Sequence, residues 1–177
     1  MIRFPETTAI ERRDMIEVYN NLYVGSQADE EAIHSQVGWF FIHACKEPYH
    51  RQALGYTGRG APKGHPEYLI ARRPGRLILN LVDADDMTYI PKQVIRLAVE
   101  EIHQQISSNK VLVNCNQGHS RSPTIAFLYM LKYAETFHTK SLDEALSAFR
   151  SIYTAYSPAR GMGDFVKASW RDFIQSR

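Results

Sequence analysis

Cysteine, net charge and long apolar runs are all scarce in this chain of 177 residues. The two cysteines, Cys45 and Cys115, are too few for a disulfide framework and indicate a reducing compartment. The 21 Lys and Arg residues nearly balance 19 Asp and Glu residues, and a net charge of +2 argues against nucleic-acid binding through bulk positive charge. No stretch reaches the ~18 apolar residues of a membrane span, and the first residues lack the apolar segment of a signal peptide. We therefore expect a cytoplasmic protein with no nucleic-acid partner and no transmembrane segment.

The length predicts a single domain over residues 1–177, because domains usually hold about 100–200 residues. An apolar share of 44% is typical of a globular chain that needs no disulfide or structural metal for its core. Residues 1–14 are polar, and we expect a loosely held arm there. Residues 50–76 are rich in Gly and Pro and predict an irregular insertion. That insertion is basic, because Glu67 is its one acidic residue and it contains six Lys and Arg residues: Arg51, Arg59, Lys63, Arg72, Arg73 and Arg76. It could recognise an acidic ligand, although solvated basic loops are commoner.

Three short apolar runs predict buried strands, at residues 39–44, 77–82 and 111–115. Helical stretches separate these runs, and this order predicts an α/β fold with a central, mostly parallel, twisted sheet flanked by helices. Two shorter strands are expected earlier, around the turn at Asn20 and Asn21. The helix signals are capping boxes at Ser26 and Ser141, an amphipathic pattern over 91–107, an almost wholly apolar stretch over 122–133, and a last helix after the breaks at Pro158 and Gly161.

The segment that carries chemistry follows the strand at 111–115. It reads Asn-Cys-Asn-Gln-Gly-His-Ser-Arg-Ser-Pro from Asn114, and it places Cys115 at the end of a buried strand and Arg121 at the start of a helix. A loop of this kind can turn successive backbone N–H groups inward around a tetrahedral anion, with Gly118 supplying a positive φ. Arg121 has the planar fork that matches two phosphate oxygens, and the positive surroundings favour the thiolate form of Cys115. A thiolate that faces a bound phosphate is a nucleophile for phosphoryl transfer.

This loop resembles the Cys-x5-Arg-Ser motif of the cysteine-dependent protein tyrosine phosphatase superfamily, and its Gly-His-Ser-Arg-Ser-Pro-Thr form is similar to the dual-specificity branch. Asn21-Leu-Tyr-Val-Gly-Ser26 resembles an early segment of those enzymes, and the acidic residues 83–86 lie where they keep a general-acid loop. The resemblance covers about residues 15–175 and implies a phosphatase-like domain, with the phosphate loop between a central strand and a buried helix.

The resemblance also implies roles for single residues. Cys115 would form a phosphocysteine, Arg121 would hold the phosphate, and Ser122 would hydrogen-bond the sulfur and ease its departure. The expected phosphate-binding residues are Asn116, Gln117, Gly118, His119, Ser120 and Arg121, with the side chain of His119 either over the anion or in solvent.

An aspartate is expected to protonate the leaving group. Asp83 is the first choice, because it directly follows the run at 77–82 and precedes Cys115 by 32 residues, a separation that resembles the family's. Asp85 is the alternative general acid, and Asp86 ranks third.

Two further residues bear on the reaction. Asn114 stands where the family usually has a histidine that orients the loop, which predicts a weakened or pH-shifted enzyme. Cys45 comes directly after the run at 39–44 and should lie at the same edge of the sheet as Cys115. By resemblance to phosphoinositide phosphatases it is a candidate redox partner that forms a reversible disulfide with Cys115, and the alternative is an ordinary buried residue.

The resulting prediction is a phosphatase acting on phosphotyrosine, and on phosphoserine and phosphothreonine, in a phosphorylated protein substrate. The alternatives are a phosphatase for a non-protein phosphate, such as a phosphoinositide or an RNA 5′-phosphate, and a non-catalytic phosphate-binding module. No cofactor and no metal are expected, because no cluster in the sequence has ligand spacing. The default oligomeric state is a monomer.

Overall fold

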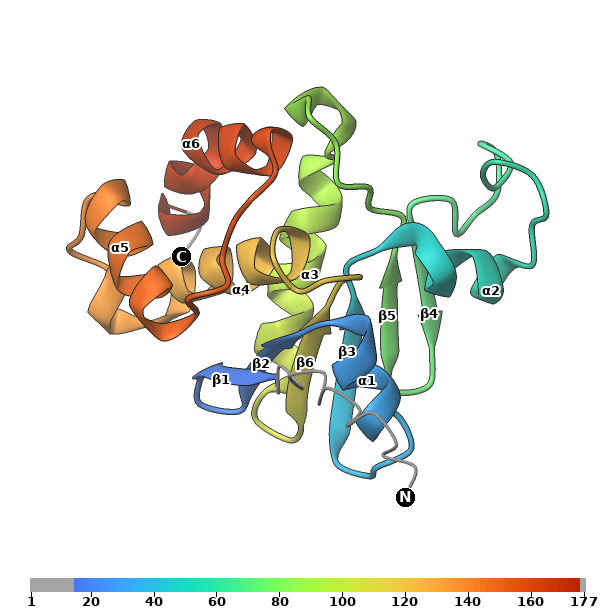
Figure 1. Cartoon of the computed structure of the whole chain (residues 1–177), viewed down its shortest axis with the longest axis horizontal. Helices are drawn as coiled ribbons and strands as arrows, with labels where there is room; N and C mark the ends of the chain where they lie inside the picture. Colours follow the sequence, from blue (N-terminus) through green and yellow to red (C-terminus); the bar gives the residue numbers. More distant parts are fainter. Residues whose placement is uncertain (1–14, 176–177) are drawn as a thin grey trace, which may run out of the picture.

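The computed structural model describes residues 15–175, which form a six-stranded sheet with helices on both faces (Figure 1). The strand order is β1-β2-β6-β3-β5-β4. The central strands are parallel, and each edge strand pairs antiparallel with its neighbour. The strands are β1 (Ile16–Tyr19), β2 (Leu22–Gly25), β3 (Trp39–His43), β4 (Ile70–Arg73), β5 (Arg76–Leu79) and β6 (Lys110–Asn114). The predicted α/β class with a mostly parallel sheet is confirmed, whereas the expected arm at 1–14 lies outside the described residues.

The helices begin where local capping signals place them. Ser26 and Ser141 each close a capping box, with Asp29 and Glu144 respectively, and Pro91 precedes α3. The helices are α1 (Gln27–Ile33), α2 (Arg51–Leu54), α3 (Lys92–Gln105), α4 (Arg121–Tyr133), α5 (Leu142–Ile152) and α6 (Arg160–Gln175). The short turns are η1 (Lys46–His50), η2 (Met87–Tyr89) and η3 (Glu135–Phe137).

The sheet separates two apolar cores of unequal size. The larger core lies under α3 and α4, and α4 is buried over nearly all of its length, as its uniformly apolar sequence predicts. The smaller core, on the face that α1 covers, contains Ile33, Phe41 and Leu112. Because successive strand residues point to opposite faces, Phe41 and His43 of β3 share the α1 face. Their rings stack in parallel at 6.2 Å. The α1 face therefore carries a polar residue directly beside its apolar core.

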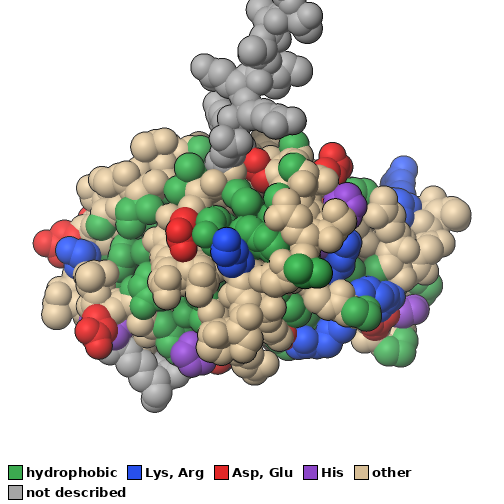
Figure 2. Space-filling model, turned by 90° about the horizontal axis from the view of Figure 1, so that it is seen from below, with side chains coloured by type: hydrophobic (Ala, Val, Ile, Leu, Met, Phe, Trp, Pro, Cys, Tyr) green, Lys and Arg blue, Asp and Glu red, His purple; other side chains and the backbone are tan. Residues whose placement is uncertain are grey.

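The segment 50–76 is more regular than predicted, because it contains α2 and the edge strand β4. β4 is short and ends in Arg72 and Arg73, so its sequence lacks the apolar run that marks a strand. Its extended backbone is held by antiparallel pairing with β5. Figure 2 shows Lys and Arg side chains gathered on the side of the molecule where α2 and β4 lie. Many of these cations are paired. Arg51 binds Glu47 at 2.7 Å, Arg73 binds Glu67 at 2.9 Å and Arg72 binds Glu101 at 2.7 Å.

The sequence predicts that Gly161 breaks the chain before the last helix, and this prediction is wrong. Gly161 lies in the first turn of α6. Its backbone N–H donates to the carbonyl oxygen of Ala84 at 3.1 Å. A Cβ at this position would lie 2.2 Å from the same oxygen, so only glycine allows α6 to approach the loop at 83–86 this closely. The glycine therefore joins two segments that flank the candidate site.

Candidate active site

Cys115 directly follows β6, the strand that lies between β2 and β3 at the centre of the sheet. Its backbone N–H points to the carbonyl oxygen of Gly25 at 3.4 Å, and α4 begins at Arg121 after a tight loop. Gly118 has a φ of 76°, and its carbonyl oxygen accepts a hydrogen bond from the hydroxyl of Tyr153 at 2.7 Å. The order of strand, loop and buried helix is the one that the sequence predicts.

The sulfur of Cys115 lies 3.1 Å from the hydroxyl oxygen of Ser122, which is itself 3.2 Å from the carbonyl oxygen of Gly25. Both side chains are almost fully buried. The single hydroxyl proton can go to the carbonyl when Cys115 is a thiol and to the sulfur when Cys115 is a thiolate. Ser122 is therefore placed to stabilise negative charge on the sulfur.

The guanidinium of Arg121 is held inside the protein by two acceptors. One terminal nitrogen donates to the carbonyl oxygen of Leu81 at 3.1 Å, and the other donates to Oδ1 of Asn116 at 2.7 Å. Its Nε is buried and has no hydrogen-bond partner among the described residues. A fixed guanidinium that retains an unused donor is suited to a planar interaction with an anion.

The loop at 83–86 is tied to the phosphate loop through Ser120. The Ser120 hydroxyl donates to Oδ1 of Asp83 at 2.8 Å and accepts a hydrogen bond from the backbone N–H of Ala159 at 2.9 Å. Asp83 is solvent-exposed, so its carboxyl group is accessible as well as anchored. This contact distinguishes Asp83 from the other two candidate acids.

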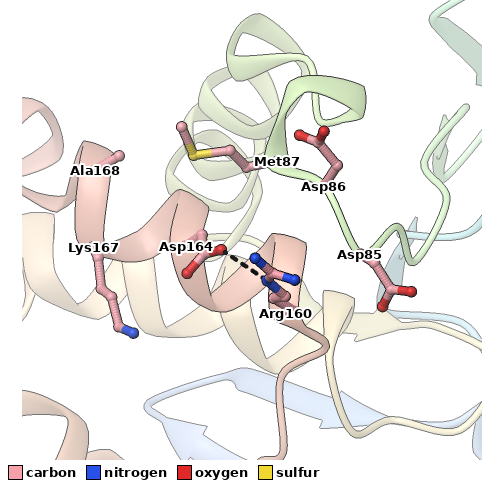
Figure 3. A pocket seen from close by; sticks show the side chains of 7 residues that line it. All are labelled: Asp85, Asp86, Met87, Arg160, Asp164, Lys167 and Ala168. Carbon is pink, nitrogen blue, oxygen red and sulfur yellow. Dashed lines mark ion pairs between the residues drawn. The ribbon is translucent and has the colours of Figure 1, made fainter.

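Asp86 caps η2 by accepting a hydrogen bond from the backbone N–H of Thr88 at 2.8 Å. That bond holds the pKa of Asp86 below its ordinary value, which favours the carboxylate form over the protonated form that a general acid needs. Asp85 lines an open hollow of about 680 Å³ between η2 and α6. Figure 3 shows the side chains of Asp85 and Asp86 pointing away from each other, with Arg160 and Asp164 as an ion pair at 3.8 Å on the α6 side.

Of the predicted phosphate-binding residues, Asn116 to Ser120 lie in the loop between β6 and α4, and Arg121 is the first residue of α4. Asn116 and Gln117 are exposed, Gly118 and Ser120 are buried, and His119 is half-buried. The Asn116 side-chain amide donates to the carbonyl oxygen of Glu47 at 2.9 Å, which anchors the loop to η1.

Four buried side chains behind this loop form a chain of hydrogen bonds that sequence patterns did not reveal. Nδ1 of His43 lies 2.9 Å from Oδ1 of Asn114, the Asn114 amide donates to the hydroxyl of Tyr49 at 3.2 Å, and that hydroxyl donates to Glu30 at 3.0 Å. Burial lowers the pKa of His43 to about 3 and raises the pKa of Tyr49. A signal was present, because a histidine inside an apolar strand needs a buried partner.

Cys45 follows β3 and therefore lies at the same edge of the sheet as Cys115, as predicted. Both cysteines are free and buried. Burial raises the pKa of Cys45 to about 12, so it is a thiol at neutral pH. Its redox pairing with Cys115 stays a prediction.

Within residues 15–175, no three His, Cys, Asp or Glu side chains are grouped so that they could hold a metal ion. None of the helices in the same region combines the length and apolar character that crossing a membrane requires.

No protein-family model matches the sequence, and no curated protein matches it. Solved structures do match. The human tyrosine phosphatase-like serine/threonine/tyrosine-interacting protein is 18% identical with a TM-score of 0.61, and the match covers 92% of this chain and 99% of that one. DUSP15 is 16% identical with a TM-score of 0.59, over 92% and 93% of the two chains. PTPMT1 is 18% identical with a TM-score of 0.55, over 90% and 95%. The chain has the fold of the dual-specificity and tyrosine phosphatases.

Proposed function

We propose that the protein is a cysteine-dependent phosphatase that hydrolyses phosphotyrosine, and phosphoserine and phosphothreonine, in proteins. The observation that carries the proposal is the buried sulfur of Cys115, 3.1 Å from the Ser122 hydroxyl, in a loop that the fixed guanidinium of Arg121 closes. This arrangement joins a nucleophile to donors for a tetrahedral dianion.

In the first step the thiolate of Cys115 attacks phosphorus, and the bond from phosphorus to the leaving oxygen breaks. The loop N–H groups and Arg121 balance the charge on the non-bridging oxygens. Asp83 gives its proton to the leaving oxygen, so a neutral alcohol or phenol departs and a phosphocysteine remains.

In the second step a water molecule attacks the phosphocysteine, and Asp83 takes a proton from that water. The bond between sulfur and phosphorus breaks, and the sulfur regains its negative charge. The Ser122 hydroxyl then donates to the departing thiolate instead of to Gly25, which lowers the energy of this leaving group.

Asp83→Asn tests the assignment of the general acid. The amide keeps an acceptor for the Ser120 hydroxyl but cannot donate a proton as an acid, so we expect about a 10²-fold to 10³-fold lower kcat on a phosphoserine peptide. Hydrolysis of p-nitrophenyl phosphate should fall less, because its leaving group needs little protonation, and the basic limb of the pH–rate profile should flatten. Asp85→Asn, two residues away, is the matched control. A larger loss in Asp85→Asn than in Asp83→Asn would reverse the assignment.

A panel of substrates tests the substrate class. Phosphotyrosine and phosphothreonine peptides, a phosphoinositide and an RNA 5′-phosphate are assayed with the wild type at several pH values, and we expect turnover of both peptides with kcat/KM at least about tenfold above the other two substrates. Preference for the phosphoinositide or the RNA would favour a non-protein substrate. Binding of the peptides without turnover of any substrate would leave a non-catalytic phosphate-binding module, which is the third candidate.

A further inference from the structure

The backbone is held by an asparagine side chain on each side of Cys115, and both asparagines bind the same turn. The Asn114 amide donates to the hydroxyl of Tyr49 at 3.2 Å, and the Asn116 amide donates to the carbonyl oxygen of Glu47 at 2.9 Å. Tyr49 and Glu47 both belong to η1, the turn that follows β3. The position of Cys115 is therefore linked to a segment about 70 residues earlier in the chain.

His43, Asn114, Tyr49 and Glu30 form a network of hydrogen bonds, and the Glu30 carboxylate, which can only accept, determines the direction of these bonds. The Tyr49 hydroxyl donates to the carboxylate of Glu30, so it accepts from the Asn114 amide. Oδ1 of Asn114 must then face His43, whose ring is neutral because burial lowers its pKa to about 3. This network assigns the ring proton of His43 to Nδ1. Each group thus donates to the next, from His43 to Glu30.

The network is buried and mounted on rigid elements. His43 and Asn114 are fully buried and are register partners on β3 and β6, and Glu30 is 3% exposed on α1. The His43 ring also stacks on Tyr49 with 3.8 Å between the ring centres. Turning the Asn114 amide over would break its hydrogen bonds to His43 and to Tyr49 together, so these two bonds favour one orientation of the residue before Cys115. Nε2 of His43 and Oε1 of Glu30 have no hydrogen-bond partner among the described residues.

We propose that His43 and Tyr49 are positioning residues that act through Asn114 to hold Cys115 and the following loop N–H groups in their phosphate-binding geometry. Neither residue touches the reacting atoms. The inference rests on the proposed function, since it takes the loop from Cys115 to Arg121 as the phosphate site.

Two substitutions of His43 separate the hydrogen bond from the packing. His43→Phe keeps a ring against Tyr49 and removes the donor to Asn114. His43→Asn removes the ring and keeps a donor on the γ carbon, where Nδ1 is attached. We expect His43→Phe to lower kcat/KM on p-nitrophenyl phosphate about tenfold or more, while His43→Asn stays within about threefold of the wild type. The melting temperature should fall more in His43→Asn, because it leaves a cavity.

A second pair of variants serves if a His43 variant fails to fold. Tyr49→Phe removes the acceptor of the Asn114 amide, and Tyr133→Phe is its matched control, because the Tyr133 hydroxyl also binds a glutamate, Glu100, at 2.9 Å but lies at the far end of α4. We expect Tyr49→Phe to lower kcat/KM about tenfold and Tyr133→Phe to leave it unchanged within about twofold.

Protection of Cys115 from iodoacetate by inorganic phosphate gives a readout that needs no turnover, with the modified cysteine located by peptide mass mapping. We expect the half-protecting phosphate concentration to rise about tenfold in His43→Phe and Tyr49→Phe. Unchanged protection and unchanged kcat/KM in both variants, with only lower melting temperatures, would overturn the positioning role. A wild type that phosphate protects but that hydrolyses no substrate would contradict the proposed catalysis alone, and the protection series would still decide the inference.

Discussion

Cys115→Ser is expected to lower kcat on p-nitrophenyl phosphate by about 10⁴-fold or more, because a serine hydroxyl is not ionised at neutral pH and attacks phosphorus far more slowly than a thiolate. The substitution replaces sulfur by oxygen and leaves the loop N–H groups and Arg121 in place. The Ser122 hydroxyl lies 3.1 Å from the sulfur in the wild type, and in the variant it would have the new serine hydroxyl as its hydrogen-bond partner. A phosphotyrosine peptide should therefore still bind, as titration calorimetry would show.

Cys45→Ala is the matched control for loss of a thiol. Because burial raises the pKa of Cys45 to about 12, this residue supplies no thiolate at neutral pH. We expect its turnover to stay within about threefold of the wild type. Residual turnover in Cys115→Ser at the wild-type level would remove Cys115 from the mechanism, and equal losses in the two variants would point to folding as their common cause.

Arg121→Lys is expected to lower kcat/KM by about 10³-fold, although the positive charge is kept. The guanidinium spans the carbonyl oxygen of Leu81 and the side chain of Asn116, and its Nε has no hydrogen-bond partner among the described residues. A single ammonium group cannot hold both acceptors and a phosphate oxygen in one plane. The loss should appear in kcat and in the inhibition constant of inorganic phosphate together, because the same group holds the substrate and the product.

Arg160→Lys is the control for this second experiment. Arg160 is at the start of α6, where its side chain is 81% exposed and pairs with Asp164 at 3.8 Å. Exposed pairs of this kind contribute little, so we expect kcat/KM to change by less than about twofold. Comparable losses in Arg160→Lys and Arg121→Lys would show that general positive charge, and not the buried fork, attracts the phosphate.

Much of the fold could be predicted because its signals are local. The capping boxes at Ser26 and Ser141 lie within four residues of the helices that they open, and three apolar runs mark the central strands. The edge strand β4 was missed because its order comes from pairing with β5 and not from its own sequence. The helical placement of Gly161 was missed because a glycine is needed there for a distant contact. A Cβ would clash with the carbonyl oxygen of Ala84, 77 residues earlier.

The sequence by itself determined the candidate nucleophile and its anion cradle, since Cys115, Gly118 and Arg121 belong to one short loop whose spacing carries the chemistry. The sequence ranked Asp83 before Asp85 as the candidate acid, and the tertiary structure added the hydrogen bond from Ser120 to Asp83. Only the tertiary structure joined His43 to Asn114. The reason is physical. A loop between a strand and a helix is shaped by neighbouring residues, whereas a buried hydrogen bond between parallel strands depends on their register, which is decided when the sheet assembles.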